Sequence, residues 1–210
     1  MRGNLFVLSG GEGAGKTTCL ELLKTRLPEG KFHFTREPGG TDFAEMLRTI
    51  FKTEFETAPD EFEQLLLVEA GRSHHVRTRM KPVLERGIHI VCDRFYESTI
   101  AYQCRKSKTH GEKVRQLFYA LNDMATGGLK PNLFIHFELP LDVALERIAN
   151  RPRKVGYNPF DDITAKEHTE IWHALHEFVR FTNHVNVDAT LPLEELADEV
   201  ARIIISFNGV

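Results

Sequence analysis

The sequence predicts an α/β fold in which helices cover both faces of a parallel β-sheet. Short apolar segments alternate with longer segments of helical periodicity along the chain, and strands that alternate with helices typically build a parallel sheet. Clusters of polar residues directly follow several of the apolar segments. In a parallel sheet these clusters meet at the edge that carries the carboxyl ends of the strands, where such proteins bind ligands.

Each element is expected from its own local pattern. The first strand, residues 4–9, is joined by a glycine-rich loop to a helix at 16–27 whose leucines share one face. Asp42 is the expected N-cap of a helix that runs to about residue 51, and Pro59 and Asp60 begin a long helix that reaches the 70s. The other expected strands are 32–35, 88–92, 133–137 and 184–188. The other expected helical segments are 81–86, 96–104, 112–126, 141–149, 164–182 and 193–205.

Composition places the chain among ordinary globular proteins. Its 210 residues suit a single domain, residues 1–210, with 41% hydrophobic and 27% charged side chains. A net charge of −3 gives no reason to expect a nucleic-acid polymer as partner. The three cysteines lie far apart, which favours free thiols in a reducing compartment. No segment resembles a signal peptide or a membrane span, so we expect a cytoplasmic protein without membrane contact.

The loop after the first strand has the spacing G-x-x-x-x-G-K-[ST] of a phosphate-binding P-loop, from Gly10 to Thr17. Glycines let successive main-chain N–H groups turn toward a polyphosphate, and the following helix adds unpaired donors. Lys16 is expected to bridge the β- and γ-phosphates, and the Thr17 hydroxyl to bind Mg²⁺. A glycine-rich connection without function would not need these residues in this order. We therefore predict a nucleotide-phosphate site.

Polar residues at two further strand ends indicate what this site does. Asp93 follows the strand at 88–92 and is a second expected Mg²⁺ ligand, with a helix cap as its alternative role. Arg36 and Arg94 also follow strands, and arginine holds phosphate with a planar fork of donors. One arginine alone would indicate a surface charge. Two of them at the edge that carries a P-loop indicate a second phosphate group, and hence phosphoryl transfer between nucleotides.

A short lid segment is expected at residues 147–162. Arg147, Arg151, Arg153 and Lys154 would fold over the transferring group, offset its charge and exclude water. A solvated basic loop is the alternative, and the pattern does not choose between Arg151 and Arg153 as the catalytic residue.

Three segments together carry a resemblance to a known family: the P-loop, residues 35–41 (T-R-E-P-G-G-T) and residues 93–103 (D-R-F-Y-E-S-T-I-A-Y-Q). In order and spacing they resemble the signature segments of bacterial-type thymidylate kinases, and a weaker similarity extends over nearly the whole chain. The resemblance implies a P-loop NTPase fold with a five-stranded parallel sheet and a homodimer. It also implies transfer of the γ-phosphoryl group of ATP, the co-substrate, to dTMP, giving dTDP.

The resemblance also implies roles for single residues by matching position. The ATP site would consist of Gly10, Gly11, Glu12, Gly13, Ala14, Gly15, Lys16, Thr17 and Thr18. The residues expected around the phosphate and sugar of dTMP are Arg36, Arg94, Glu12 and Tyr102. The residues expected at the base are Arg72, Thr99 and Gln103. The expected catalytic groups are Lys16, Arg94 and Glu12, with a lid arginine added because the P-loop itself has none.

The chain departs from the family pattern at the base and in the lid. Val68 stands four positions before Arg72, where the family usually has an aromatic residue that stacks on thymine. Base–aromatic stacking is worth about 1–3 kcal/mol, so its loss weakens acceptor binding about ten- to a hundredfold unless another ring replaces it. Residues 160–162 (F-D-D) replace the acidic and basic run of the family lid. A deoxynucleotide kinase with another or broader base preference is therefore the first alternative.

Two alternatives belong to other functional classes. A non-catalytic P-loop switch would bind nucleotide with negligible turnover, and it has no evident need for Arg36 and Arg94. A small-metabolite kinase would leave Tyr102 and Gln103 without a role. Five histidines lack companion ligands at metal spacing, and we interpret them as parts of solvated helix faces: His74, His75, His168, His173 and His176.

Overall fold

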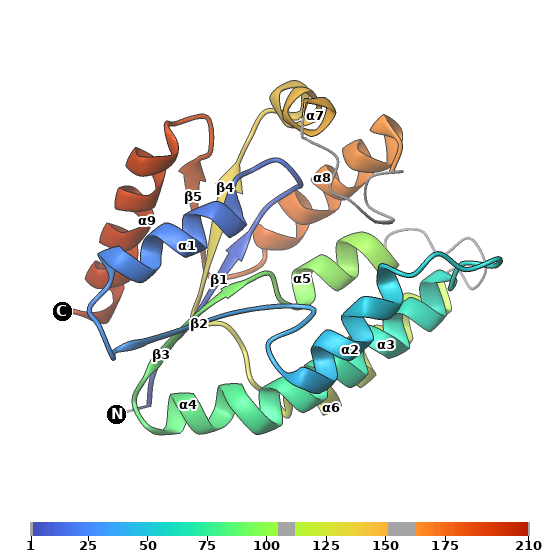
Figure 1. The fold of residues 1–210 in the computed structure, drawn as a ribbon, viewed down its shortest axis with the longest axis horizontal. Helices are drawn as coiled ribbons and strands as arrows, with labels where there is room; N and C mark the ends of the chain where they lie inside the picture. Colours follow the sequence, from blue (N-terminus) through green and yellow to red (C-terminus); the bar gives the residue numbers. More distant parts are fainter. Residues whose placement is uncertain (1, 105–111, 151–162, 210) are drawn as a thin grey trace.

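The computed structural model describes residues 2–104, 112–150 and 163–209. Over these residues the strands form one five-stranded sheet in the order β2-β3-β1-β4-β5, and every adjacent pair is parallel (Figure 1). The strands are β1 (Leu5–Ser9), β2 (Phe32–Arg36), β3 (His89–Asp93), β4 (Leu133–Glu138) and β5 (His184–Asp188). This confirms the predicted fold class.

Helices cover both faces of the sheet, as predicted. Helices α1 (Lys16–Arg26) and α9 (Leu193–Asn208) lie side by side on one face, where Phe6 and Leu8 of β1 join their core (Figure 1). On the other face, Leu5 and Val7 pack against residues of a long helical run. Because successive side chains of a strand point to opposite faces, β1 is buried on both sides, which explains its uninterrupted apolar sequence.

The long helical run consists of α3 (Glu61–His75), the π-helical turn η1 (Val76–Met80) and α4 (Lys81–Glu85). It starts at a capping box, in which the Asp60 carboxylate accepts the N–H of Glu63 and the Glu63 carboxylate accepts the N–H of Asp60. The expected start at Asp60 is thus confirmed. The two helices expected over this stretch are joined by the π turn.

The remaining helices agree with the expected positions. They are α2 (Asp42–Phe51), α5 (Tyr96–Thr99), α6 (Glu112–Thr126), α7 (Leu141–Ala149) and α8 (Ala165–Val179), and α5 continues into the π-helical turn η2 (Ile100–Cys104). One cap differs from expectation. Thr41, not Asp42, is the N-cap of α2, because the Thr41 hydroxyl accepts the N–H of Ala44 and Asp42 lies in the first turn. Within the described ranges, no helix is both long enough and apolar enough to cross a bilayer.

Candidate active site

The polar strand ends meet at one edge of the sheet. In the register of the strands, Asp93 at the end of β3 lies opposite Leu8 of β1 and opposite Arg36 of β2. The P-loop follows β1, between β3 and β4 in the sheet order. Since β1 lies at the point where the chain order of the sheet changes direction, the P-loop occupies the place where open parallel sheets bind ligands.

The P-loop has the backbone that a phosphate cradle needs. Gly15, the residue before α1, has a φ of 82°, and Gly10 has a φ of 140°. A Cβ at Gly10 would lie 2.9 Å from the carbonyl oxygen of Phe137, so only glycine fits this close approach. Lys16 is buried and donates from Nζ to the carbonyl oxygen of Gly11 at 2.6 Å. Burial, assisted by the charge of Arg94, lowers the pKa of Lys16 to about 8.

Thr17 and Asp93, the two expected Mg²⁺ ligands, are in direct contact. The Thr17 hydroxyl donates to Asp93 Oδ2 at 2.5 Å, and this bond links the start of α1 to the end of β3. Asp93 is buried, and its second oxygen, Oδ1, has no hydrogen-bond partner in the described part of the chain. A buried carboxylate oxygen without a partner beside a threonine hydroxyl fits a hard divalent cation. This pair would hold Mg²⁺, and the bound ion would neutralise charge on the phosphates.

Arg94 lies beside the P-loop with two other predicted residues. Its Nη2 donates to Glu12 Oε1 at 2.6 Å, and the Tyr102 hydroxyl donates to the same oxygen at 3.1 Å. Its Nη1 approaches the carbonyl oxygen of Gly10 at 3.3 Å and the Ser98 hydroxyl at 3.2 Å. Although burial opposes it, the Tyr102 and Glu12 groups hold the pKa of Arg94 above its ordinary value, so the guanidinium stays charged.

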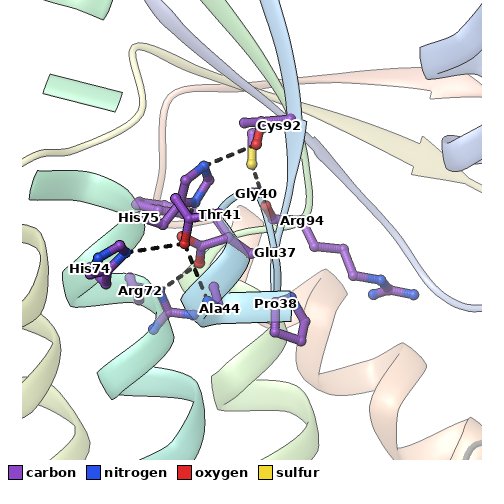
Figure 2. Close-up of polar contacts among 12 residues, drawn as sticks. Glu37, Pro38, Gly40, Thr41, Ala44, Arg72, His74, His75, Cys92 and Arg94 are labelled. Carbon is purple, nitrogen blue, oxygen red and sulfur yellow. Dashed lines mark hydrogen bonds and ion pairs between the residues drawn. The ribbon is translucent and has the colours of Figure 1, made fainter. Parts of the chain in front are cut away.

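The backbone of Arg94 is strained. Its φ of 69° lies in the left-handed region that favours glycine, and among the described residues no other non-glycine residue has a positive φ. Such strain is typical of functional sites, where the surrounding structure enforces it. Figure 2 shows the side chain extending away from the Glu37–Arg72 pair.

Arg72 lies in a second, fully buried cluster that joins elements far apart in sequence. Its Nε donates to Glu37 Oε2 at 2.8 Å and its Nη2 to the Thr99 hydroxyl at 2.8 Å (Figure 2 shows the Glu37 pair). Its Nη1 donates to Glu69 and, at 3.2 Å, to Asn122 Oδ1. The predicted residues Arg72 and Thr99 are thus brought together, with partners that were not predicted.

The other residues predicted at the base lie near this cluster along the chain. Val68 precedes Arg72 by one turn of α3 and is 7% exposed. Gln103, in η2, is buried and donates to Gln64 Oε1 at 3.2 Å. Both positions are therefore enclosed by protein.

Arg36 lies apart from Arg94. Its side chain is half exposed and donates from Nη2 to both carboxylate oxygens of Glu45, each at 3.0 Å. Within the described ranges, no hydrogen bond joins Arg36 to the P-loop or to Arg94. Glu45 also accepts the N–H of Gly40 at 3.1 Å, so the Arg36 side chain lies along its own loop.

Several residues of the site were not predicted, and one was misinterpreted. His75, expected on a solvated helix face, has no exposed surface and contacts Thr35 and Glu37. Glu69 is also buried; within the residues that the structure describes its Oε2 has no hydrogen-bond partner, and burial raises the pKa of Glu69. Arg72 and His75 are three residues apart, on adjacent turns of one helix, and this spacing is the sequence signal that could have indicated a shared face.

Most of the expected lid, residues 151–162 with Arg151, Arg153 and Lys154, lies outside the described residues. Arg147, at its start, donates to the carbonyl oxygens of Gly13 at 3.3 Å and of Ala189 at 3.0 Å. The beginning of the segment is thus held against the P-loop.

A parallel sheet in this order, with a phosphate cradle after its central strand and a buried polar cluster beside it, is the architecture of P-loop nucleotide kinases. The comparisons with known proteins narrow this class. The family model described as thymidylate kinase matches residues 8–200. A thymidylate kinase of Pseudomonas fluorescens is 42% identical over 73% of this chain and 72% of its own length. Thymidylate kinases of Geobacillus thermodenitrificans and Lacticaseibacillus casei are 34% and 32% identical over 98% and 93% of this chain, and over 91% and 92% of their own lengths. The chain belongs to the thymidylate kinase family.

Proposed function

We propose that the protein transfers the γ-phosphoryl group of ATP to dTMP. The bond between the γ-phosphorus and the bridging oxygen of ADP breaks, and a bond to a phosphate oxygen of dTMP forms, giving dTDP and ADP. The observation that supports this best is the pairing of two charged sets at adjacent strand ends. Lys16 with Thr17 and Asp93 suits the donor, and Arg94 with Glu12 suits the acceptor.

On the donor side, the main-chain amides of residues 10–18 would surround the ATP phosphates. Lys16 would exchange its hydrogen bond to the carbonyl oxygen of Gly11 for contacts with the β- and γ-phosphates. This needs only a small movement, because Gly11 is itself part of the cradle. Thr17 and Asp93 would hold Mg²⁺. The chain's own part in the chemistry is to position the phosphates and stabilise charge as it develops.

On the acceptor side, Arg94 would bind the phosphate of dTMP. Glu12, whose Oε1 accepts hydrogen bonds from Arg94 and Tyr102, would lie at the sugar together with Tyr102. Arg36 would reach the same phosphate only by leaving Glu45, which its half-exposed position allows. Arg72 and Thr99 would contact the base, together with Gln103 and Val68. A lid arginine, Arg151 or Arg153, would complete the catalytic set.

The assay that tests this function measures ADP release with ATP, Mg²⁺ and one acceptor at a time from dTMP, dUMP, dCMP, dGMP and AMP. We expect dTMP to give the highest kcat/KM. A preference for another deoxynucleotide would favour the alternative suggested by Val68, a deoxynucleotide kinase with another or broader base preference. ATP binding with no acceptor-dependent turnover would indicate a nucleotide-binding switch.

We also propose that the protein is a homodimer in the cytoplasm. Exposed apolar side chains lie on α2, α3 and α6, which pack side by side: Met46, Leu66 and Met124 are 68%, 43% and 80% exposed (Figure 1 shows the helices). A second copy of the chain would cover them. Sedimentation should show a dimer that Met124→Glu dissociates. Phe181→Glu, at an exposed position outside these helices, should leave the dimer intact.

The cysteines support the cytoplasmic location. All three are free and buried, as is usual for a reducing compartment.

A further inference from the structure

We propose that His75 is a positioning residue of the acceptor site: by holding one oxygen of Glu37, it directs the other oxygen to Arg72 and so fixes the guanidinium that contacts the base. The inference rests on the proposed role of Arg72 at the base of dTMP. It assigns a task to a histidine that does not itself touch Arg72 in the described contacts.

The imidazole of His75 lies fully buried between two residues that flank Arg36. Its Nδ1 lies 3.1 Å from Glu37 Oε1, and its Nε2 lies 2.9 Å from the Thr35 hydroxyl. Figure 2 shows the ring between α3 and the loop that follows β2. A Cβ at Gly40 would lie 2.4 Å from His75 Nε2, so the ring also packs directly beneath this loop.

The direction of the hydrogen bond between His75 and Glu37 follows from the charge of Glu37. Although burial opposes it, the charge of Arg72 and the bond from His75 hold the pKa of Glu37 below its ordinary value. An ionised carboxylate only accepts hydrogen bonds, so His75 donates from Nδ1. The second hydrogen bond joins Nε2 to the Thr35 hydroxyl.

Glu37 transmits this position to Arg72. The main-chain N–H of Glu37 donates to the carbonyl oxygen of Asp93 at 3.0 Å, which ties its backbone to the end of β3. With the backbone tied and Oε1 held by His75, Oε2 receives Arg72 Nε at 2.8 Å, and Arg72 Nη2 then reaches Thr99. Without the His75 donor, Oε1 would be a buried charged acceptor without that partner, and the carboxylate would turn toward other donors, including those of Arg72.

Two substitutions distinguish the roles of the two ring nitrogens of His75. The side-chain amide of asparagine lies near the position of Nδ1, whereas the longer glutamine reaches that of Nε2. His75→Asn should therefore keep the bond to Glu37, and His75→Gln should lose it. Because a hydrogen bond to a charged group is lost, we expect the KM for dTMP to rise about tenfold or more in His75→Gln. It should stay within about threefold of the parent in His75→Asn, with the KM for ATP unchanged in both.

A merely structural role for His75 would lower the melting temperature and affect both substrates alike. Equal KM values for dTMP in the two variants, raised or not, would overturn the proposal. Thr35→Val provides a second test that keeps the core volume, because it removes only the bond to Nε2. We expect it to leave the KM for dTMP within about twofold, and a tenfold increase would overturn the route through Glu37.

Arg72→Lys distinguishes this inference from the proposed function on which it rests. If Arg72→Lys raises the KM for dTMP and His75→Gln does not, His75 has no positioning role, and Arg72 still belongs to the acceptor site. If Arg72→Lys changes neither KM, both the role of Arg72 and the inference fail. His173→Asn, at an exposed position of α8, is the matched control and should behave as the parent enzyme.

Discussion

The donor and acceptor sides of the site are built in different ways. On the proposed donor side the groups that would bind phosphate are mostly main-chain amides, and Lys16 donates to a carbonyl oxygen that belongs to the same loop. On the acceptor side, Arg72 is held by the charged side chains of Glu37 and Glu69 and by the polar groups of Thr99 and Asn122. Apart from the contact between Thr17 and Asp93, the first side is local in sequence, whereas the second joins the loop after β2 to α3, α5 and α6.

This difference predicts that the two sides respond differently to mutation. A charge that is buried and awaits a ligand adds nothing to folding, and its lowered pKa shows that burial disfavours the charged form. A charge that is buried within an ion-pair cluster cannot be removed without leaving its partners uncompensated. Donor-side changes should therefore affect catalysis and spare stability, and changes in the Arg72 cluster should affect both.

The largest expected effect is that of Lys16→Ala on turnover. In its proposed role Lys16 stabilises charge that develops during phosphoryl transfer, so we expect kcat to fall by about a hundred- to a thousandfold or more. Because the hydrogen bond of Lys16 in the described part of the chain goes to a carbonyl oxygen and not to a carboxylate, thermal unfolding should be unchanged or shifted to higher temperature. Steady-state kinetics and a melting curve measure both, and a kcat within tenfold of the parent would contradict the role of Lys16.

The second effect is on stability. Arg72→Leu removes a guanidinium that is 2% exposed, so Glu37 keeps a buried charge without its partner. We expect the free energy of unfolding to fall by about 3–5 kcal/mol, as is usual when one partner of a buried pair is removed. Denaturant titration measures this. A loss no greater than that in Lys16→Ala would show that the two sides do not differ in the way described.

The third effect concerns the base. Val68→Phe introduces the ring that the family usually has one turn before Arg72, and stacking on the base should lower the dTMP KM about tenfold. The ATP KM should not change. Since Val68 is only 7% exposed, the larger ring fits only if the space beside it is open to the base and not filled by neighbouring side chains. Weaker dTMP binding with a lower melting temperature would show that neighbouring side chains already fill this space.

The smallest effect is a proton taken up with ATP. Since burial lowers the pKa of Lys16 to about 8, the free protein loses this charge above that pH. Phosphate favours the ammonium form and raises its pKa, so at pH 8 ATP binding should take up about half a proton, and at pH 6 almost none. Calorimetry in two buffers of different ionisation enthalpy measures the uptake. The always-charged Lys16→Arg variant should show none, and equal uptake there would assign the proton to another group.

The fold and the position of the P-loop in it could be predicted from the sequence because both depend on local patterns. Strands buried on both faces appear as apolar runs, and a P-loop is contiguous from Gly10 to Thr17. The acceptor side depends on pairs such as Glu37 with His75, 38 positions apart, and no local pattern marks such a contact. For the same reason the sequence predicted a solvated face for His75. The cap of α2 is a local feature, but Thr41 and Asp42 are both favoured N-cap residues, so the local pattern alone did not distinguish them.

The left-handed backbone of Arg94 has a consequence for protein engineering. Glycine or asparagine at position 94 would relax a conformation that costs about 1–3 kcal/mol, so a screen that rewards heat resistance alone would enrich these replacements. The selected variants would melt at a higher temperature but would lack the guanidinium proposed to bind the acceptor phosphate. Directed evolution of this chain therefore needs a selection that counts product as well as survival on heating.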